Sequence, residues 1–162
     1  MAASGDFDAF FEEHYTAVYR ALTLVFADIR VAEDAAQEGF FRAYRQWRRV
    51  KEMGRPATWV YVVAVRSQRR RLAKEERADT STAPAKNQST PEDTAIEGDL
   101  VERLLDTLTP RQREVVVLRY VGGLRLAEIA DALGCALGTV KATLHVSLQK
   151  MHLEAEETAD AN

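Results

Sequence analysis

Residues 108–151 read LTPRQREVVVLRYVGGLRLAEIADALGCALGTVKATLHVSLQKM, and their pattern predicts the helices of the C-terminal part of the chain. Thr109 has the side chain of a helix N-cap, Pro110 suits the first helical position, and Gln112 has the spacing of a capping box. The pattern therefore predicts a helix that begins at Pro110 and ends at the glycine pair 122–123.

Two shorter helices are predicted further along the same stretch. The first covers 125–133 and ends at Gly134, and the second runs from 139 to about 153 after the turn 135–138. Each has one apolar face, made by Leu126, Ile129, Ala130, Leu133, Val140, Leu144 and Leu148. Two such helices joined by a tight turn are typical of a helix-turn-helix, whose second helix reads the DNA major groove. A plain helical hairpin explains the spacing equally well, so both interpretations stay open at this point.

The rest of the chain also shows helical periodicity. Apolar residues recur at intervals of three and four over 7–24, 31–47 and 99–108. Residues 59–72 begin with a valine-rich run that favours a strand, but the segment continues without a turn signal and its neighbours are helical. We therefore predict a helix there and an all-α protein.

A change of composition divides the chain into two parts. Residues 77–98 contain two prolines and many small polar residues but almost no large apolar ones, which is typical of a flexible linker. We expect two small helical domains, over 1–76 and 99–153, followed by an acidic tail over 154–162.

The residue types present exclude several classes of protein. A single cysteine, Cys135, excludes an intramolecular disulfide, and three histidines without ligand spacing predict neither a metal nor a cofactor. No glycine-rich phosphate loop or nucleophile motif is present, so an enzyme is the least favoured class. The longest apolar run, Trp59–Val65, is far shorter than the ~20 residues that span a bilayer, and the start lacks a secretion-signal layout. We expect a cytoplasmic protein without a membrane span.

The charge of the chain changes sign from block to block, although the net charge is only -3. Residues 41–77 carry twelve basic and three acidic side chains, a net +9, whereas 1–40 and 78–107 are acidic and 108–153 carry +3. Because the electrostatic footprint of a nucleic-acid-binding protein is local, the +9 block favours a nucleic-acid interface. A solvated helix face is an adequate explanation of the +3 block.

Two segments of the sequence carry a resemblance to a known family. The first is 108–151, with matches at Leu108, Pro110, Arg113, Glu114, Leu118, Arg119, Glu128, Ile129, Ala130, Leu133, Gly138, Thr139, Val140, Lys141, Leu144 and His145. The second reads VAEDAAQEGFFRAYRQW over 31–47 and RRVKEMGRPATWVYVVAVRSQRRRL over 48–72, with matches at Asp34, Gln37, Glu38, Phe41, Ala43, Tyr44, Trp59 and Tyr61. In these residues the chain resembles the sigma-four and sigma-two domains of the extracytoplasmic-function (ECF) subfamily of sigma-70 family RNA polymerase sigma factors.

This resemblance implies a function and a set of site residues. It implies a sigma factor that binds RNA polymerase core, recognises the minus-35 and minus-10 elements of promoter DNA and assists promoter melting. Docking on the clamp of the largest polymerase subunit is implied for Asp34, Gln37, Glu38, Phe41 and Arg45. Contact with minus-10 DNA is implied for Lys51, Arg55, Trp59, Tyr61, Arg66, Arg69 and Arg70. Contact with minus-35 DNA is implied for Arg119, Lys141, Ala142, His145 and Val146. The polymerase flap is a second expected docking point, and an anti-sigma factor is a candidate partner.

The sequence departs from the family pattern at the expected DNA-reading face. Ala136 and Leu137 stand where the family usually has a proline before Gly138, and Thr143, Val146 and Leu148 stand in the recognition helix where it often has arginine. Each missing arginine removes a contact worth ~1–3 kcal/mol. We therefore expect minus-35 binding that is either weak or unusual in its preference.

Two other interpretations remain open from the sequence. The first is a stand-alone helix-turn-helix regulator with 1–76 as a dimerisation or sensing module, which predicts a dimer on a palindromic site. The second is an interaction protein that keeps a sigma-like fold and titrates an anti-sigma factor.

Overall fold

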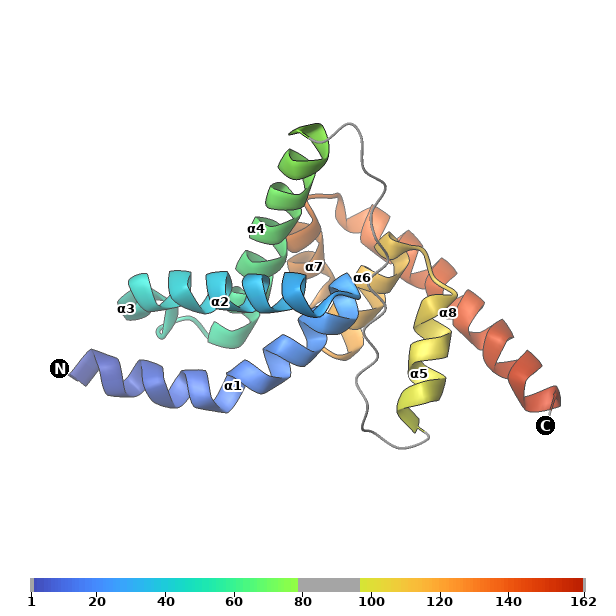
Figure 1. Cartoon of the computed structure of the whole chain (residues 1–162), viewed down its shortest axis with the longest axis horizontal. Helices are drawn as coiled ribbons and strands as arrows, with labels where there is room; N and C mark the ends of the chain where they lie inside the picture. Colours follow the sequence, from blue (N-terminus) through green and yellow to red (C-terminus); the bar gives the residue numbers. More distant parts are fainter. Residues whose placement is uncertain (1, 79–96, 162) are drawn as a thin grey trace.

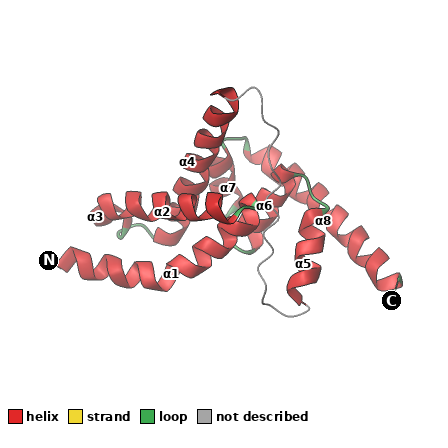
Figure 2. Cartoon of the chain, in the orientation of Figure 1, coloured by secondary structure: helices red, strands yellow, loops and turns green. Residues whose placement is uncertain are grey.

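The computed structural model describes residues 2–78 and 97–161, and Figure 1 shows how their helices are arranged. The helices are α1 (Ala2–Phe26), α2 (Ile29–Arg45), α3 (Trp47–Val50), α4 (Pro56–Ala78), α5 (Glu97–Asp106), α6 (Pro110–Tyr120), α7 (Leu126–Leu133) and α8 (Leu137–Asp160). Short turns join the helices within residues 2–78 and within residues 97–161, and these parts of the chain contain no strand (Figure 2). The predicted all-α fold is confirmed.

The N-terminal half is a bundle in which α2 packs against both α1 and α4. Asp28 caps the start of α2, since its carboxylate accepts hydrogen bonds from two backbone N–H groups at 2.8 and 3.2 Å. Gly39 allows α2 and α4 to approach closely: a Cβ at this position would lie 3.0 Å from both the Cβ of Ala64 and the carbonyl oxygen of Val60. This close contact fixes the basic helix α4 beside α2.

The C-terminal half contains the predicted helix-turn-helix, formed by α7 and α8. The capping box before α6 is present: the Gln112 N–H donates to Thr109 Oγ1 at 3.3 Å, and the Thr109 N–H donates to Gln112 Oε1 at 3.0 Å. Gly134 ends α7 with a φ of 64°, the left-handed conformation that glycine adopts without strain. Helix α8 packs against both α6 and α7, which leaves one of its sides outward.

The two halves pack directly against each other. Helix α1 contacts α6, and α4 contacts α7, so that α7 lies beside the basic helix in Figure 1. The buried apolar side chains of both halves form one continuous cluster. The predicted DNA-binding side of α4 therefore faces the helix-turn-helix in this structure.

Several helix boundaries differ from those predicted, most clearly in three segments. The helix expected over 31–47 is two helices, α2 and α3, which meet at Gln46. Helix α4 is longer than the predicted 59–72 at both ends. Helix α8 continues to Asp160, so most of the segment expected as an acidic tail is helical, because its alanines and glutamates favour helix and no glycine or proline interrupts them.

The linker predicted over 77–98 falls almost entirely outside the described residues. None of the described helices combines the length and the apolar character that a membrane span requires.

Candidate functional site

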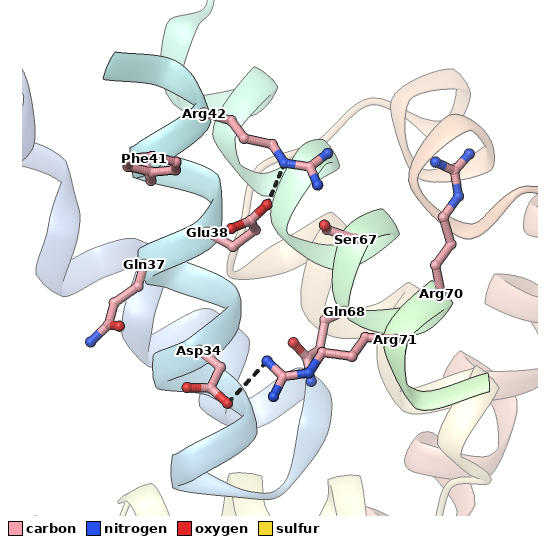
Figure 3. A pocket seen from close by; sticks show the side chains of 9 residues that line it. All are labelled: Asp34, Gln37, Glu38, Phe41, Arg42, Ser67, Gln68, Arg70 and Arg71. Atoms are coloured by element: carbon pink, nitrogen blue, oxygen red, sulfur yellow. Dashed lines mark hydrogen bonds and ion pairs between the residues drawn. The ribbon is translucent and has the colours of Figure 1, made fainter. Parts of the chain in front are cut away.

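An open groove of about 710 Å³ runs between α2 and α4 (Figure 3). It is lined by Asp34, Gln37, Glu38, Phe41, Arg42, Ser67, Gln68, Arg70 and Arg71. Four of the five residues predicted to bind polymerase core are in this set. The fifth, Arg45, lies nearby with its guanidinium 5.9 Å from the centre of the Phe41 ring.

The charged side chains of this groove are held only by weak, exposed ion pairs. The Asp34 carboxylate is 3.4 Å from the Arg71 guanidinium, and Glu38 pairs with Arg42 one turn along α2. The Asp34 and Glu38 side chains are 50% and 40% exposed. Exposed pairs of this kind contribute about 0–1 kcal/mol, so a binding partner can replace them at little cost.

Aromatic surface adjoins this acidic face. Phe41 is 56% exposed and Tyr44 is 54% exposed. Figure 3 shows Asp34 pointing toward Arg71, while Gln37 and Phe41 project from the other side of α2. One helix therefore offers carboxylates, an amide and an aromatic ring to a partner.

The residues predicted to bind minus-10 DNA lie on the α3–α4 loop and on α4, in two different environments. Lys51 is exposed and 3.5 Å from Asp6. Trp59 is half-buried, whereas Tyr61 is only 5% exposed, and burial raises the pKa of its phenol. Tyr61 therefore packs in the core of this conformation. Its predicted contact with DNA stays a prediction.

Three predicted DNA-binding arginines are paired with the C-terminal half. Arg55 forms an ion pair with Glu128 and donates to the Gly123 carbonyl at 2.6 Å. Arg66 forms an ion pair with Asp131 and donates to the carbonyl of the same residue at 3.0 Å. Sequence reasoning missed these pairs, because their partners are 65 and 73 positions apart along the chain.

The third pair, between Arg69 and Glu114, is the most buried. Arg69 Nη1 lies 2.7 and 2.6 Å from the two carboxylate oxygens of Glu114, which is 8% exposed. Burial raises the pKa of Glu114, and the neighbouring Arg69 and Arg111 oppose that shift. The direction of the pKa shift shows that the loss of solvent outweighs the attraction of the two arginines.

The reading face of the helix-turn-helix is open. Lys141, Ala142, His145 and Val146 are all exposed on the N-terminal half of α8. The side chains behind them are held inside: Val140 is fully buried, and Ser147 donates to the Thr143 carbonyl at 2.6 Å.

Arg119, the remaining predicted minus-35 residue, does not lie free on the surface. Its guanidinium donates to the Leu124 carbonyl at 3.0 Å and so braces the turn between α6 and α7. Among the described residues, no three histidine, cysteine or acidic side chains are arranged to hold a metal ion.

An all-helical chain with a basic helix in one half and a helix-turn-helix in the other falls in the class of DNA-binding transcription proteins. Two family models agree: Sigma-70 region 2 matches residues 10–78, and Sigma-70, region 4 matches residues 98–151. The chain belongs to the ECF subfamily of sigma-70 family RNA polymerase sigma factors.

Curated relatives of similar length belong to the same family. The chain is 30% identical over 160 residues to the ECF RNA polymerase sigma factor SigL of Mycobacterium tuberculosis, covering 92% of this chain and 88% of the relative. It is 28% identical over 151 residues to the RNA polymerase sigma-E factor of Streptomyces coelicolor, covering 92% and 85%.

Solved structures share the fold. The sigma factor RpoE of Bartonella quintana, in complex with the anti-sigma factor NepR, matches with a TM-score of 0.72 at 18% identity, over 93% of this chain and 97% of the other. CnrH, in complex with the cytosolic domain of CnrY, matches with a TM-score of 0.60 at 20% identity, over 96% and 93%.

Proposed function

We propose that this chain directs promoter-specific transcription initiation, with its N-terminal domain (1–76) on polymerase core and minus-10 DNA and its C-terminal domain (99–153) on minus-35 DNA. The linker 77–98 would allow each domain to reach its own element. One observation carries the proposal: in a member of the ECF sigma family, four of the five residues predicted to bind core line one exposed groove between α2 and α4, and the fifth lies nearby.

The chemistry of this groove suits a basic protein surface. Asp34 and Glu38 can exchange their weak intramolecular pairs for cations of the polymerase clamp. Phe41 supplies an exposed aromatic anchor, the kind of side chain that contributes much of the affinity at protein interfaces.

The exposed side of α8 suits a DNA groove with few phosphate contacts. Lys141 and His145 provide the polar atoms of the reading face, and Ala142 and Val146 provide apolar surface. Apolar side chains contact the methyl group of thymine in the major groove. We infer a preference for thymine in the minus-35 element, which replacement of thymine by uracil in the promoter would weaken.

We infer one further partner and two further properties from the same family assignment. The solved structures of RpoE and CnrH hold those proteins with NepR and with CnrY, respectively. We infer that this chain also binds an anti-sigma factor, that it works in the cytoplasm, and that it has no catalytic activity of its own.

The docking role is tested with Phe41→Ala and the matched control Leu153→Ala. Both side chains are strongly exposed, at 56% and 60%, so neither change should disturb folding. We expect Phe41→Ala to weaken binding to core polymerase by about tenfold or more, as measured by fluorescence anisotropy, and Leu153→Ala to have little effect. Equal affinities for the two variants, or no core binding by the wild-type chain, would contradict the proposal.

A further inference from the structure

Three arginines of the N-terminal half, Arg55, Arg66 and Arg69, are held by carboxylates of the C-terminal half. The carboxylates come from α6 and α7 and belong to Glu114, Glu128 and Asp131. We call these three pairs the arginine latch. The pairing is selective, because Arg71, which lies on α4 with Arg66 and Arg69, pairs instead within its own half, with Asp34 and Glu75.

Each pair of the latch makes two polar contacts. In two of the pairs the arginine donates to a carboxylate and also to a backbone carbonyl, and in the third the arginine contacts both oxygens of the carboxylate. Arg55 reaches both Glu128 and the Gly123 carbonyl, and Arg66 reaches both the side chain and the carbonyl of Asp131. These are directed contacts of the guanidinium group, not general attraction between charged surfaces.

The same guanidinium atoms are needed for phosphate. Carboxylate and phosphate oxygens bind the arginine fork in the same geometry, so a guanidinium engaged with one is not free for the other. All three latch arginines belong to the set predicted to hold minus-10 DNA.

We propose that the arginine latch keeps the free chain closed, with Glu114, Glu128 and Asp131 in the place of DNA phosphates, so that minus-10 DNA and the C-terminal half compete for the same arginines. This proposal rests on the proposed function, since that function supplies the DNA role of Arg55, Arg66 and Arg69. In the closed chain the N-terminal half is unable to bind single-stranded DNA through these arginines until α4 separates from α6 and α7.

The pairs of the latch are exposed enough for DNA to replace the carboxylates. The side chains of Arg55 and Arg66 are each 36% exposed, and that of Asp131 is 66% exposed, so DNA can approach these pairs from solvent. Arg69 and Glu114 are more enclosed, and the raised pKa of Glu114 shows that burial of this carboxylate carries a cost. The three pairs therefore favour the closed arrangement because they occupy the arginines, but they do not prevent the chain from opening.

Other contacts also support the closed arrangement. Arg113 of α6 donates from Nε to the Leu24 carbonyl of α1 at 2.6 Å, and the apolar core continues from one half into the other. Loss of part of the latch should therefore increase the fraction of open chains without unfolding either half.

The test compares the double variant Glu128→Gln, Asp131→Asn with the control Glu157→Gln, Asp160→Asn. Both double variants remove two negative charges, so any general increase in attraction to DNA is the same for both. The control residues are exposed at the far end of α8. The Glu128→Gln change keeps the side-chain oxygen that accepts the Arg125 N–H at 2.8 Å at the start of α7. Fluorescent dyes are placed through Gln46→Cys and Gln149→Cys in a Cys135→Ser background, so that energy transfer reports the separation of the halves.

We expect the latch variant to show lower energy transfer than the control and to bind a fluorescent single-stranded deoxyoligonucleotide about tenfold more tightly, because binding competence scales with the open fraction. Unchanged energy transfer overturns the latch. Lower energy transfer with DNA affinity equal to that of the control overturns the competition.

A charge exchange provides a second test. Asp131→Arg alone should lower energy transfer, and addition of Arg66→Asp should restore it by re-forming the pair with reversed polarity. No restoration overturns the role of this pair. Both tests use the free chain, whereas the proposed function fails if the wild-type chain does not bind core polymerase, so the two failures are distinguishable.

Discussion

Glu114 is the residue where burial and charge are most directly opposed. It is 8% exposed, and burial raises its pKa above 4.5 in spite of Arg69 and Arg111. Its position on α6 is marked in the sequence only as a match to the family pattern. The contact with Arg69 of α4 depends on the packing of the two halves, which no local pattern encodes.

The raised pKa gives a pH dependence with a definite sign. Between pH 4.5 and the raised pKa, the folded chain holds a proton at Glu114 that the unfolded chain has released, so the free energy of unfolding contributed by this group falls as pH rises. We expect Glu114→Gln to remove this contribution. The difference in unfolding free energy, wild type minus variant, should therefore decrease with rising pH in urea titrations. A difference that is constant or increases with pH would contradict this assignment.

Gly39 tests the close contact between α2 and α4. Valine at this position would place its Cβ 3.0 Å from the Val60 carbonyl oxygen and the Ala64 Cβ. A Cβ added at Gly5, on α1, would meet no heavy atom within 4 Å, so Gly5→Val is the matched control for helix propensity. We expect Gly39→Val to lower the free energy of unfolding by about 1–3 kcal/mol more than Gly5→Val, as measured by urea denaturation. Equal effects would show that this contact is not tightly packed.

At the scale of helices, the sequence predicts those features that local chemistry controls. The capping box at Thr109 and the left-handed glycine at the end of α7 are both present, because caps depend on residues within one turn. The break between α2 and α3 is missed, because no glycine or proline marks Gln46. The helical continuation of α8 is missed because its acidic composition suggests a solvated tail.

The cap of α6 can be tested separately from tertiary packing. Thr109→Ala removes the oxygen that accepts the Gln112 N–H, and we expect it to lower the free energy of unfolding by about 0.5–2 kcal/mol in chemical denaturation. Thr158→Ala is the control, because the Thr158 hydroxyl donates within α8 to the Glu154 carbonyl and caps no helix start. A loss for Thr109→Ala no larger than that for the control would argue against the cap.

The candidate site likewise contains features that the sequence predicts and contacts that it does not predict. The face that carries Asp34, Glu38 and Phe41 follows from helical spacing and the family resemblance, and the structure brings these residues to one groove. The pairing of Arg55, Arg66 and Arg69 with the C-terminal half does not follow from either. It depends on how two helical units meet across residues that are not adjacent in sequence.

In the closed arrangement of the whole molecule, some of the predicted binding surfaces are exposed and others are occupied. The groove between α2 and α4 and the reading face of α8 are open, whereas the latch arginines are occupied. Under the proposed function, core polymerase would dock on the closed chain before minus-10 DNA is held. In this scheme the polymerase-bound chain opens, and the arginines then become available to the separated DNA strand.

The most direct measurement is transcription by core polymerase with this chain on a library of promoter sequences, with transcript starts mapped by sequencing. We expect transcripts from defined starts that share elements near minus-10 and minus-35, that require the chain, and that decrease with Phe41→Ala but not with Leu153→Ala. Transcripts that are the same with and without the chain, or starts without shared upstream elements, would contradict the proposed function.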